Sequence, residues 1–406
     1  MAEIRISPGE AQVLRAVAAR RVEYRWRSGR ISDRYTIGDE NITVAARPLA
    51  RRGLIWNPPG STRPELSPVA AAWVAAHPAP APPAIGMRLP WSSVPTELAR
   101  TVQSHLGAPV AEATTQTGGF SPGVAARLRL ADGRRVFAKA VGPLPNPDSP
   151  VLHRAEGRIA ARLPLAAPAP RLIATFEAHG WVVLVFEDVD GAPPDLPWKK
   201  DQLDRVLAAL ADLSAVLTPS PLDAPTVVER FGEEFRGWRR LAAGSPPAER
   251  APDTIIGDND PDALDPWACR HLDALADLET RWADAATGDS LVHADLRADN
   301  LLLTPDRVVV VDWPWACVAA PWFDLLAMLP SVRMQGGPAP EDVFDAHPVA
   351  RGADADAVTA TIAALVGFFV RQSRQPAPPG LPTLRPFQAA QGRAALDWLR
   401  IRTGWS

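Results

Sequence analysis

The spacing of hydrophobic and polar residues changes near residue 190. Before it, apolar residues follow mostly strand-like patterns; the predicted elements are two strands over 124–141 around an Asp132-Gly133 turn, a helix over Leu152–Leu163 and a buried strand over Trp181–Phe186. After it, the period is mainly helical; the predicted elements are helices at 203–217, 266–287, 355–371 and 385–400, with short strands at 300–303 and 308–311. The pattern predicts an α+β fold with a small β-rich N-lobe at residues 88–190 and a helical C-lobe at residues 191–406.

The first 78 residues carry a separate set of signals. The predicted elements, in order, are a helix starting at Ser7-Pro8 with the apolar face Val13, Leu14 and Val17, a helix starting at Asn41, two short strands at 54–56 and 63–66, and a helix capped by Ser67-Pro68. This order resembles a winged-helix domain, which we place at residues 1–78. A Pro/Ala-rich stretch at residues 79–87 is predicted to be a semi-rigid linker.

Charge is unevenly distributed between these parts. Residues 1–80 contain 12 Arg, no Lys and 7 acidic residues, a net charge of +5, whereas the rest of the chain carries −8. A basic winged helix suggests DNA as a partner, with Arg51, Arg52 and Arg63 on phosphates. Pro48 opposes this interpretation, because proline breaks or kinks the helix that would enter the groove. The alternative is a domain that packs or contacts protein, with its arginines as a solvated face.

Composition limits the location and the class of the protein. The 406 residues include 47% hydrophobic and 22% charged residues, which is ordinary globular usage. Cys269 and Cys317 are the only cysteines, which predicts a reducing compartment and leaves a zinc site short of ligands. The N-terminus lacks an apolar signal core, and the apolar run Ala357–Val370 is shorter than the roughly 18 residues needed to span a bilayer. We therefore expect a cytoplasmic protein without a membrane partner.

The strongest chemical signal lies at residues 291–313. His293, Asp295 and Asn300 follow a short apolar run, and Asp312 closes the Val-rich stretch 308–311. Phosphoryl transfer from a nucleotide needs a carboxylate near the acceptor hydroxyl and hard oxygen ligands for magnesium. In this interpretation Asp295 orients and finally deprotonates the acceptor, Asn300 and Asp312 hold Mg²⁺, and His293 braces the loop.

These residues resemble the aminoglycoside phosphotransferase and choline kinase family, small-molecule relatives of the protein kinases. The family motif His-x-Asp-x-x-x-x-Asn matches His293 to Asn300, and Asp312-Trp313 matches its metal-binding Asp followed by Trp. The resemblance covers roughly residues 90–400. It implies a bilobal kinase-like fold, ATP and Mg²⁺ as cofactors, and a small-molecule hydroxyl acceptor of the aminoglycoside, sugar or amino-alcohol type. A further Asp-Leu of the family corresponds to Asp324, which we expect to be a buried structural carboxylate.

The N-lobe supplies the matching nucleotide-binding candidates. Lys139, one of three lysines, ends a predicted strand where kinase-like folds bind the α- and β-phosphates, and Glu156 lies on the next helix as its partner. Gly118, Gly119 and Ser121 form a glycine-rich turn whose amides could cover phosphates. That turn lacks the full G-x-G-x-x-G pattern, so a plain turn is the alternative. Glu187 lies in the segment that resembles the family's interlobe hinge, whose backbone groups would bind the nucleotide base. Its side chains do not indicate whether the nucleotide is ATP or GTP.

The acceptor site and the activity keep alternatives at this stage. The C-lobe offers exposed-looking acids (Asp342, Asp345, Asp354 and Asp356) and tryptophans (Trp198, Trp238, Trp267, Trp322 and Trp398) that could bind a cation or stack on a sugar. The competing interpretation of the acids is a solvated face. For the chain as a whole, the alternative is a nucleotide-binding pseudokinase or sensor coupled to a DNA-binding winged helix. The oligomeric state is not predicted.

Overall fold

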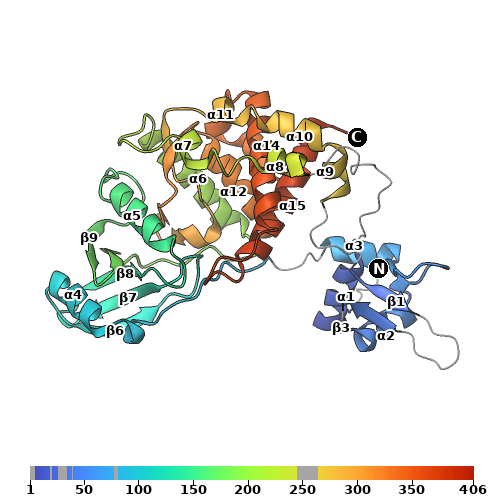
Figure 1. Cartoon of the computed structure of the whole chain (residues 1–406), viewed down its shortest axis with the longest axis horizontal. Helices are drawn as coiled ribbons and strands as arrows, with labels where there is room; N and C mark the ends of the chain where they lie inside the picture. Colours follow the sequence, from blue (N-terminus) through green and yellow to red (C-terminus); the bar gives the residue numbers. More distant parts are fainter. Residues whose placement is uncertain (1–4, 19–20, 26–33, 39, 77–80, 245–263) are drawn as a thin grey trace. The chain divides into compact units, whose positions relative to one another are not determined.

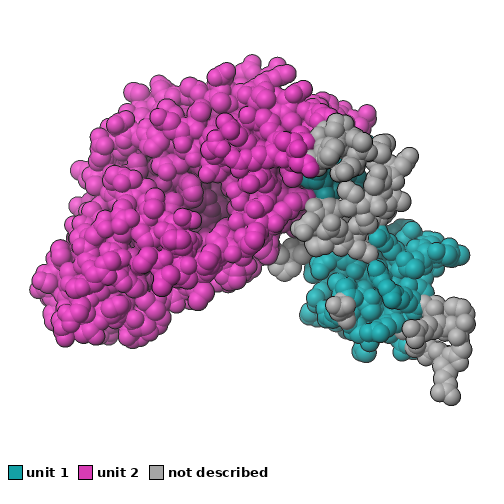
Figure 2. All heavy atoms as spheres, in the orientation of Figure 1, with its two compact units in different colours: residues 1–80, 247–270 teal, residues 81–246, 271–406 magenta. Residues whose placement is uncertain are grey.

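The computed structural model describes residues 5–18, 21–25, 34–38, 40–76, 81–244 and 264–406. The chain divides into two compact units, drawn in teal and magenta in Figure 2: residues 1–80 with 247–270, and residues 81–246 with 271–406. We call them the N-terminal unit and the main unit. Of the predicted linker, residues 79 and 80 lie outside the described residues.

The N-terminal unit combines short helices with antiparallel strands. Its elements are α1 (Pro8–Ala18), β1 (Glu23–Arg25), β2 (Arg34–Ile37), β3 (Glu40–Asn41), α2 (Thr43–Arg51), β4 (Ile55–Trp56), β5 (Glu65–Leu66), α3 (Pro68–Ala76) and α9 (Pro266–Arg270). A capping box starts α1, because the Ser7 and Glu10 side chains each accept the other's backbone N–H at 3.3 and 2.8 Å. The predicted apolar face of α1 is buried, which confirms it: Val13, Leu14 and Val17 are at most 3% exposed.

Two features of this unit bear on the prediction from the sequence. The sheet of order β1-β2-β3 was not predicted, because its strands are only two to four residues long. Helix α2 confirms the helix predicted from Asn41, and it continues through Pro48 to Arg51. The proline removes one N–H from the ladder, yet Ala46 and Leu49 of the same helix are fully buried, so packing holds the helix together. The resemblance to a winged helix stays a prediction.

The N-lobe of the main unit is a five-stranded antiparallel sheet with two helices. Its elements are a 3₁₀ turn (Trp91–Ser93), α4 (Thr96–Leu106), β6 (Val110–Thr115), β7 (Val124–Leu130), β8 (Arg135–Val141), α5 (Ser149–Ala160), β9 (Leu172–Ala178) and β10 (Trp181–Glu187). The strand order is β6-β7-β8-β10-β9. The predicted strand pair over 124–141, the helix after it and the strand at 181–186 are all confirmed. The sheet lies at one end of the main unit and the helices of the C-lobe at the other (Figure 1).

Strand alternation assigns residues to the two faces of this sheet. Val183 and Val185 of β10 belong to the core that α4 covers. Leu184, between them, points to the opposite face, where it lies against Gly157 of α5. Lys139 pairs with Leu184 in the register of β8 and β10, so it shares the face of α5. The pleat therefore directs the lysine toward the helix that carries Glu156.

The C-lobe is mainly helical, with short strands around the catalytic segment. Its elements are α6 (Lys200–Val216), α7 (Val227–Phe231), α8 (Gly237–Gly244), α10 (Leu272–Glu279), α11 (Trp282–Ala285), β11 (Ser290–Val292), a 3₁₀ turn (Ala298–Asn300), β12 (Leu301–Leu303), β13 (Val308–Val310), β14 (Cys317–Ala319), α12 (Phe323–Met334), α13 (Pro340–Ala346), a 3₁₀ turn (Pro348–Ala350), α14 (Ala355–Gln372) and α15 (Leu384–Thr403). Strands β12 and β13 form one antiparallel pair, and β11 and β14 form another. The predicted strands near 300–303 and 308–311 are confirmed.

The helical predictions were correct except over 266–287. There the structure has α9, α10 and α11 in place of one helix. The hydroxyl of Thr280 donates to the carbonyl of Asp277 at 2.6 Å and competes with the backbone ladder where α10 ends. Helix α14 is long and apolar enough to cross a membrane by length and composition, but 56% of that stretch is buried within the protein. It packs against α8, α10, α11 and α15 as a core helix.

Candidate active site

A buried carboxylate shapes the loop that carries the predicted catalytic residues. Asp324, at the start of α12, is 3% exposed and accepts the backbone N–H groups of His293 and Ala294 at 2.8 and 2.7 Å. Burial raises the pKa of Asp324 to about 6. Ala294 has a φ of 62°, a left-handed conformation that is unfavourable for alanine. The two hydrogen bonds offset this strain, so Asp324 is the structural carboxylate that the sequence predicted.

His293 links the two halves of the catalytic segment. Its Nε2 lies 3.0 Å from the carbonyl oxygen of Val311, so this nitrogen is the donor, and its Nδ1 accepts the backbone N–H of Asp295 at 3.2 Å. The ring packs edge-on against Trp313 with centroids 4.7 Å apart. Burial lowers the pKa of His293 to about 4, so the ring is neutral at physiological pH. This geometry matches a bracing role, because both ring nitrogens are hydrogen-bonded to backbone groups.

Asp295 lies between an arginine and an asparagine. The guanidinium of Arg297 contacts Asp295 Oδ1 and forms a bidentate pair with Asp299 at 3.0 and 2.9 Å. Asn300 Nδ2 donates to the carbonyl oxygen of Asp295 at 2.8 Å and to its Oδ2 at 3.3 Å. Burial raises the pKa of Asp295 to about 7, against the opposing charge of Arg297. Arg297 lies within the motif that spans His293 to Asn300, but its pairing with Asp295 and Asp299 was not predicted.

Lys139 contacts one carboxylate from each lobe, and its contact with Asp312 joins the two lobes. Its Nζ lies 2.7 Å from Glu156 Oε1 and 2.6 Å from Asp312 Oδ1. Burial would lower the pKa of Lys139, but the two carboxylates outweigh it and raise the pKa. Burial likewise favours protonated Asp312, yet the nearby Lys139 charge holds the pKa of Asp312 below its ordinary value. The pKa of Glu156, which is buried more deeply, is raised.

The predicted nucleotide-binding residues line one cavity of about 470 Å³, which we call the nucleotide cavity after that prediction. Gly118, Gly119, Ser121, Lys139, Glu156, Glu187, Asn300 and Asp312 all line it. Asp312 follows β13 by two residues and has a φ of 70°, a left-handed conformation. The hinge residue Glu187 pairs with Arg171 at 3.1 Å. The volume lies in the range of about 300–1,000 Å³ that holds small-molecule ligands and cofactors.

A segment before the glycine-rich turn fixes that turn in place. Residues 84–89, which we call the strap, bond to it through Gly119 N–H to Ala84 O at 2.9 Å and Gly123 N–H to Met87 O at 3.1 Å. The strap also bonds to the C-lobe, through Met87 N–H to Gly380 O at 2.8 Å. The guanidinium of Arg88 contacts the carbonyl oxygens of Gly118 and Ser121 and lines the nucleotide cavity. Nothing in the local sequence around Arg88 had marked this role.

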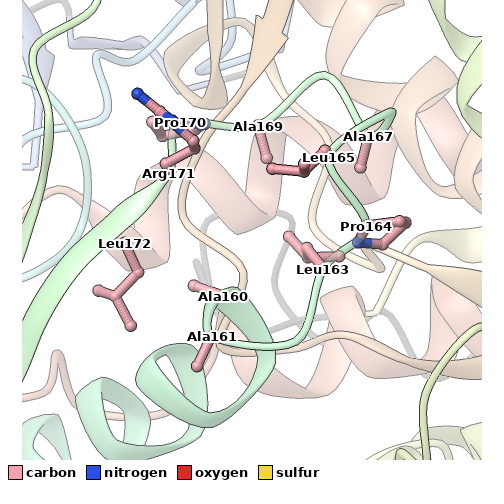
Figure 3. Close-up of a pocket in the computed structure, with 10 residues that line it drawn as sticks. All are labelled: Ala160, Ala161, Leu163, Pro164, Leu165, Ala167, Ala169, Pro170, Arg171 and Leu172. Carbon is pink, nitrogen blue, oxygen red and sulfur yellow. The ribbon is translucent and has the colours of Figure 1, made fainter.

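A second cavity of about 230 Å³ meets the first at the catalytic centre. Both are lined by Ser121, Glu156 and Asp312, whereas Asp295 lines only the second. The surface of the main unit is hollowed on the face in view in Figure 2. A third hollow of about 180 Å³ shares Ala160 and Pro170 with the nucleotide cavity. Its lining is apolar apart from Arg171 (Figure 3), so it offers no acid–base pair.

The residues proposed from the sequence to bind the acceptor lie elsewhere. None of the four aspartates or five tryptophans lines either of the two main cavities. The aspartates are exposed, and Asp354 caps α14 by accepting the N–H of Ala357. The tryptophans are buried core residues; for example, Trp238 is fully buried and donates to Ala363 O at 2.8 Å. The solvated-face interpretation of the acids therefore agrees with the structure, and Trp315, which was not proposed, lines the second cavity.

Comparison with known proteins identifies the family. The model of the phosphotransferase enzyme family, APH, matches residues 120–365, more than half of the chain. The chain belongs to this family. As a phosphotransferase with a bilobal kinase-like fold, it is a small-molecule kinase, which confirms the family resemblance and the fold predicted from the sequence. No curated protein sequence matches it significantly.

Solved structures of other phosphotransferases are similar to this chain at low identity. A thermostable mutant of aminoglycoside phosphotransferase APH(4)-Ia, in ternary complex with AMP-PNP and hygromycin B, is 15% identical with a TM-score of 0.50, covering 77% of this chain and 100% of that one. APH(3'')-Id from Streptomyces rimosus, in complex with ADP and streptomycin, is 20% identical with a TM-score of 0.43, covering 68% and 99%. The first likeness supports the kinase-like fold of the phosphotransferase family.

Proposed function

We propose that this phosphotransferase transfers the γ-phosphoryl group of ATP to a hydroxyl of a small molecule. The observation that carries the proposal is the junction of two cavities at Asp312, with the lysine and glycine-rich turn on one side and Asp295 on the other. A nucleotide in the first cavity would direct its terminal phosphate toward an acceptor in the second. Because the donor is ATP, we place the reaction in the cytoplasm.

The chain's own groups fit the steps of an in-line transfer. The acceptor oxygen forms a bond to the γ-phosphorus while the bond from that phosphorus to the β–γ bridging oxygen breaks, and ADP leaves. Asp295 orients the hydroxyl and takes its proton, a role suited to a carboxyl with a pKa of about 7. Lys139, held by Glu156, neutralises phosphate charge. Arg88 and the glycine-rich turn line the same cavity.

Magnesium fits the donor set of the site. Asn300 and Asp312 both line the nucleotide cavity and offer hard oxygens. Within the described residues, no cluster of three or more His, Cys, Asp or Glu could hold a metal on its own. This agrees with the usual Mg²⁺ site of such enzymes, in which one or two protein oxygens are completed by substrate phosphates and water. When bound, Mg²⁺ would neutralise charge on the phosphates.

Two variants and a metal test would check the proposal. We expect Asp295→Asn to keep ATP binding but to lower kcat by about 10²–10⁴-fold, the range for a positioned acid or base. Lys139→Met should instead weaken ATP binding, whereas Lys199→Met, an exposed lysine paired with Asp195, should change nothing. Chelation of Mg²⁺ should stop turnover. A wild-type protein that binds ATP with Mg²⁺ but transfers phosphate to neither water nor any alcohol would support the pseudokinase alternative.

We also propose that residues 1–78 bind nucleic acid, on the basis of the net charge of +5 that residues 1–80 carry. Arg51 is exposed at the end of α2, but Arg52 is engaged by Glu10 at 2.9 Å and by the carbonyl of Arg5 at 2.7 Å. Fluorescence anisotropy of the full chain with random duplex DNA would test this. If arginines contact phosphates, the log of the affinity must fall with the log of salt by about 0.9 per contact. No binding at low salt would leave a packing or protein-contact role.

A further inference from the structure

Aromatic rings form a large part of the lining of the second cavity. Seven of the chain's 11 phenylalanines line it, together with Trp315. Several form a connected wall, with ring centroids 5.2 Å apart for Phe231 and Phe235, 6.1 Å for Phe231 and Trp315, and 5.9 Å for Phe235 and Phe368. Trp315 and Phe368 are only half-buried, so part of each ring remains free for a ligand. Such a wall favours apolar groups with ring shapes.

The charged groups at this cavity are nearly all neutralised by the protein itself. Glu156 and Asp312 share Lys139, and Asp295 pairs with Arg297. Within the described part of the chain, Glu234 is the one carboxylate lining this cavity that has no ion-pair partner. Each ammonium group of a buried ligand needs a carboxylate or water, because an unpaired charge is costly to desolvate. The cavity can therefore accept one positive charge, and a polycation would leave several unpaired.

The size of the cavity limits the acceptor further. Its volume of about 230 Å³ is half that of the nucleotide cavity and lies below the usual range of about 300–1,000 Å³ for drug-sized ligands. The part of an acceptor that lies within this volume is smaller than a multi-ring aminosugar. Charge and lining disfavour a multi-ring polycation as the acceptor, and the small volume agrees with this.

We propose that the acceptor is a small alcohol with an apolar ring body and at most one positive charge. Its ring packs on Trp315 and Phe368, its hydroxyl faces Asp295, and an amine, where present, pairs with Glu234. The hydroxyl oxygen bonds to the γ-phosphorus of ATP, its proton passes to Asp295, and ADP leaves. This inference rests on the proposed function, since it names the acceptor class of that same site.

A matched panel of acceptors tests the class. With Mg-ATP and the full chain, 2-phenylethanol and phenylalaninol represent apolar ring alcohols with zero and one positive charge, glucose a polar neutral alcohol, and hygromycin B a polycation. Phosphate esters are detected by mass spectrometry, and binding by calorimetry in the presence of AMP-PNP. We expect kcat/KM, or affinity where turnover is slow, to be at least about tenfold higher for the two ring alcohols. A preference for glucose or hygromycin B, or no binding of either ring alcohol, would overturn the inference.

Variants of the wall separate a ligand site from a structural core. Trp315→Ala and Phe368→Ala should each raise the KM or Kd for 2-phenylethanol about tenfold or more, with ATP affinity unchanged. Trp56→Ala, which removes a ring that is 47% exposed in the N-terminal unit, is the control. Glu234→Gln should weaken phenylalaninol about tenfold and leave 2-phenylethanol unaffected. Equal effects of Glu234→Gln on both alcohols would contradict the single-charge assignment.

ATP hydrolysis and ATP binding by the wild-type chain test the proposed function independently of the acceptor class. Slow Mg-dependent hydrolysis of ATP by the wild-type chain, or transfer of phosphate to any alcohol of the panel, supports phosphotransfer whichever acceptor is preferred. If the wild-type chain neither hydrolyses ATP nor phosphorylates any alcohol, and does not bind ATP, the proposed function itself is rejected. A kinase that turns over hygromycin B best would keep the proposed function and reject the apolar acceptor.

Discussion

Asp324 offers a sharp test of how the catalytic loop is held, because its side chain is hydrogen-bonded to two backbone amides of that loop. Its oxygens accept the N–H groups of His293 and Ala294 at 2.8 and 2.7 Å, and Ala294 is left-handed. Asp324→Asn keeps one accepting oxygen and turns an amide NH₂ toward the other N–H. A hydrogen bond to a charged group contributes about 1.5–3 kcal/mol. Losing one should therefore reduce the population of the active loop, and kcat, by about 10- to 100-fold, because about 1.4 kcal/mol corresponds to a factor of ten.

The assay is steady-state ATP turnover with calorimetric ATP binding on the same protein. ATP affinity should change less than about twofold, since Lys139 and the glycine-rich turn do not contact Asp324. Glu279→Gln is the control. Glu279 is fully buried, accepts the N–H groups of Trp238 and Arg239 at 3.0 and 3.1 Å and pairs with the Arg239 guanidinium at 3.0 Å, but it lines neither main cavity. It should lower the Tm and spare kcat. A wild-type kcat in Asp324→Asn, or an equal loss of kcat in the control, would refute the reasoning.

Three further predictions follow from the site and the strap. Because the pKa of Asp295 is raised to about 7 and its carboxylate accepts the proton, kcat/KM should fall about tenfold per pH unit below 7. An acidic limb near 4, with circular dichroism unchanged, would show an unperturbed carboxyl. Arg88→Met should raise the KM for ATP about tenfold, because it frees the carbonyls of Gly118 and Ser121; an unchanged KM would remove Arg88 from nucleotide binding. Limited proteolysis should cut within residues 77–83, because residues 84–89 are bonded into the main unit; protection of 77–83 would indicate a docked linker.

Much of the catalytic centre could be predicted because its parts are local in sequence. His293, Asp295 and Asn300 lie on one loop, so their spacing alone brings them together. Lys139 could be predicted from its position near the end of an apolar strand. In the structure it pairs with Glu156, the glutamate that the sequence suggested on the next helix. These inferences needed only strand alternation and short-range spacing.

The acceptor cavity could not be predicted, because it is assembled from distant segments. Phe231, Trp315 and Phe368 come from α7, the segment after β13 and α14, and each looks like an ordinary core residue in its own element. Arg88 was missed because its partners are backbone carbonyls, which have no residue-type signature. Strand β6 was missed because most of its side chains are exposed, so it lacks the alternation of a half-buried strand.

The strap determines where another N-terminal domain could be fused to the main unit without loss of kinase activity. A breakpoint placed by the change in composition, near residue 88, would transfer the catalytic residues to a new partner but leave behind Ala84 and Met87, which bond to the glycine-rich turn. Chimeras joined before residue 84 keep those bonds, whatever precedes them. Shuffling of N-terminal domains onto this phosphotransferase is therefore expected to succeed only upstream of the strap.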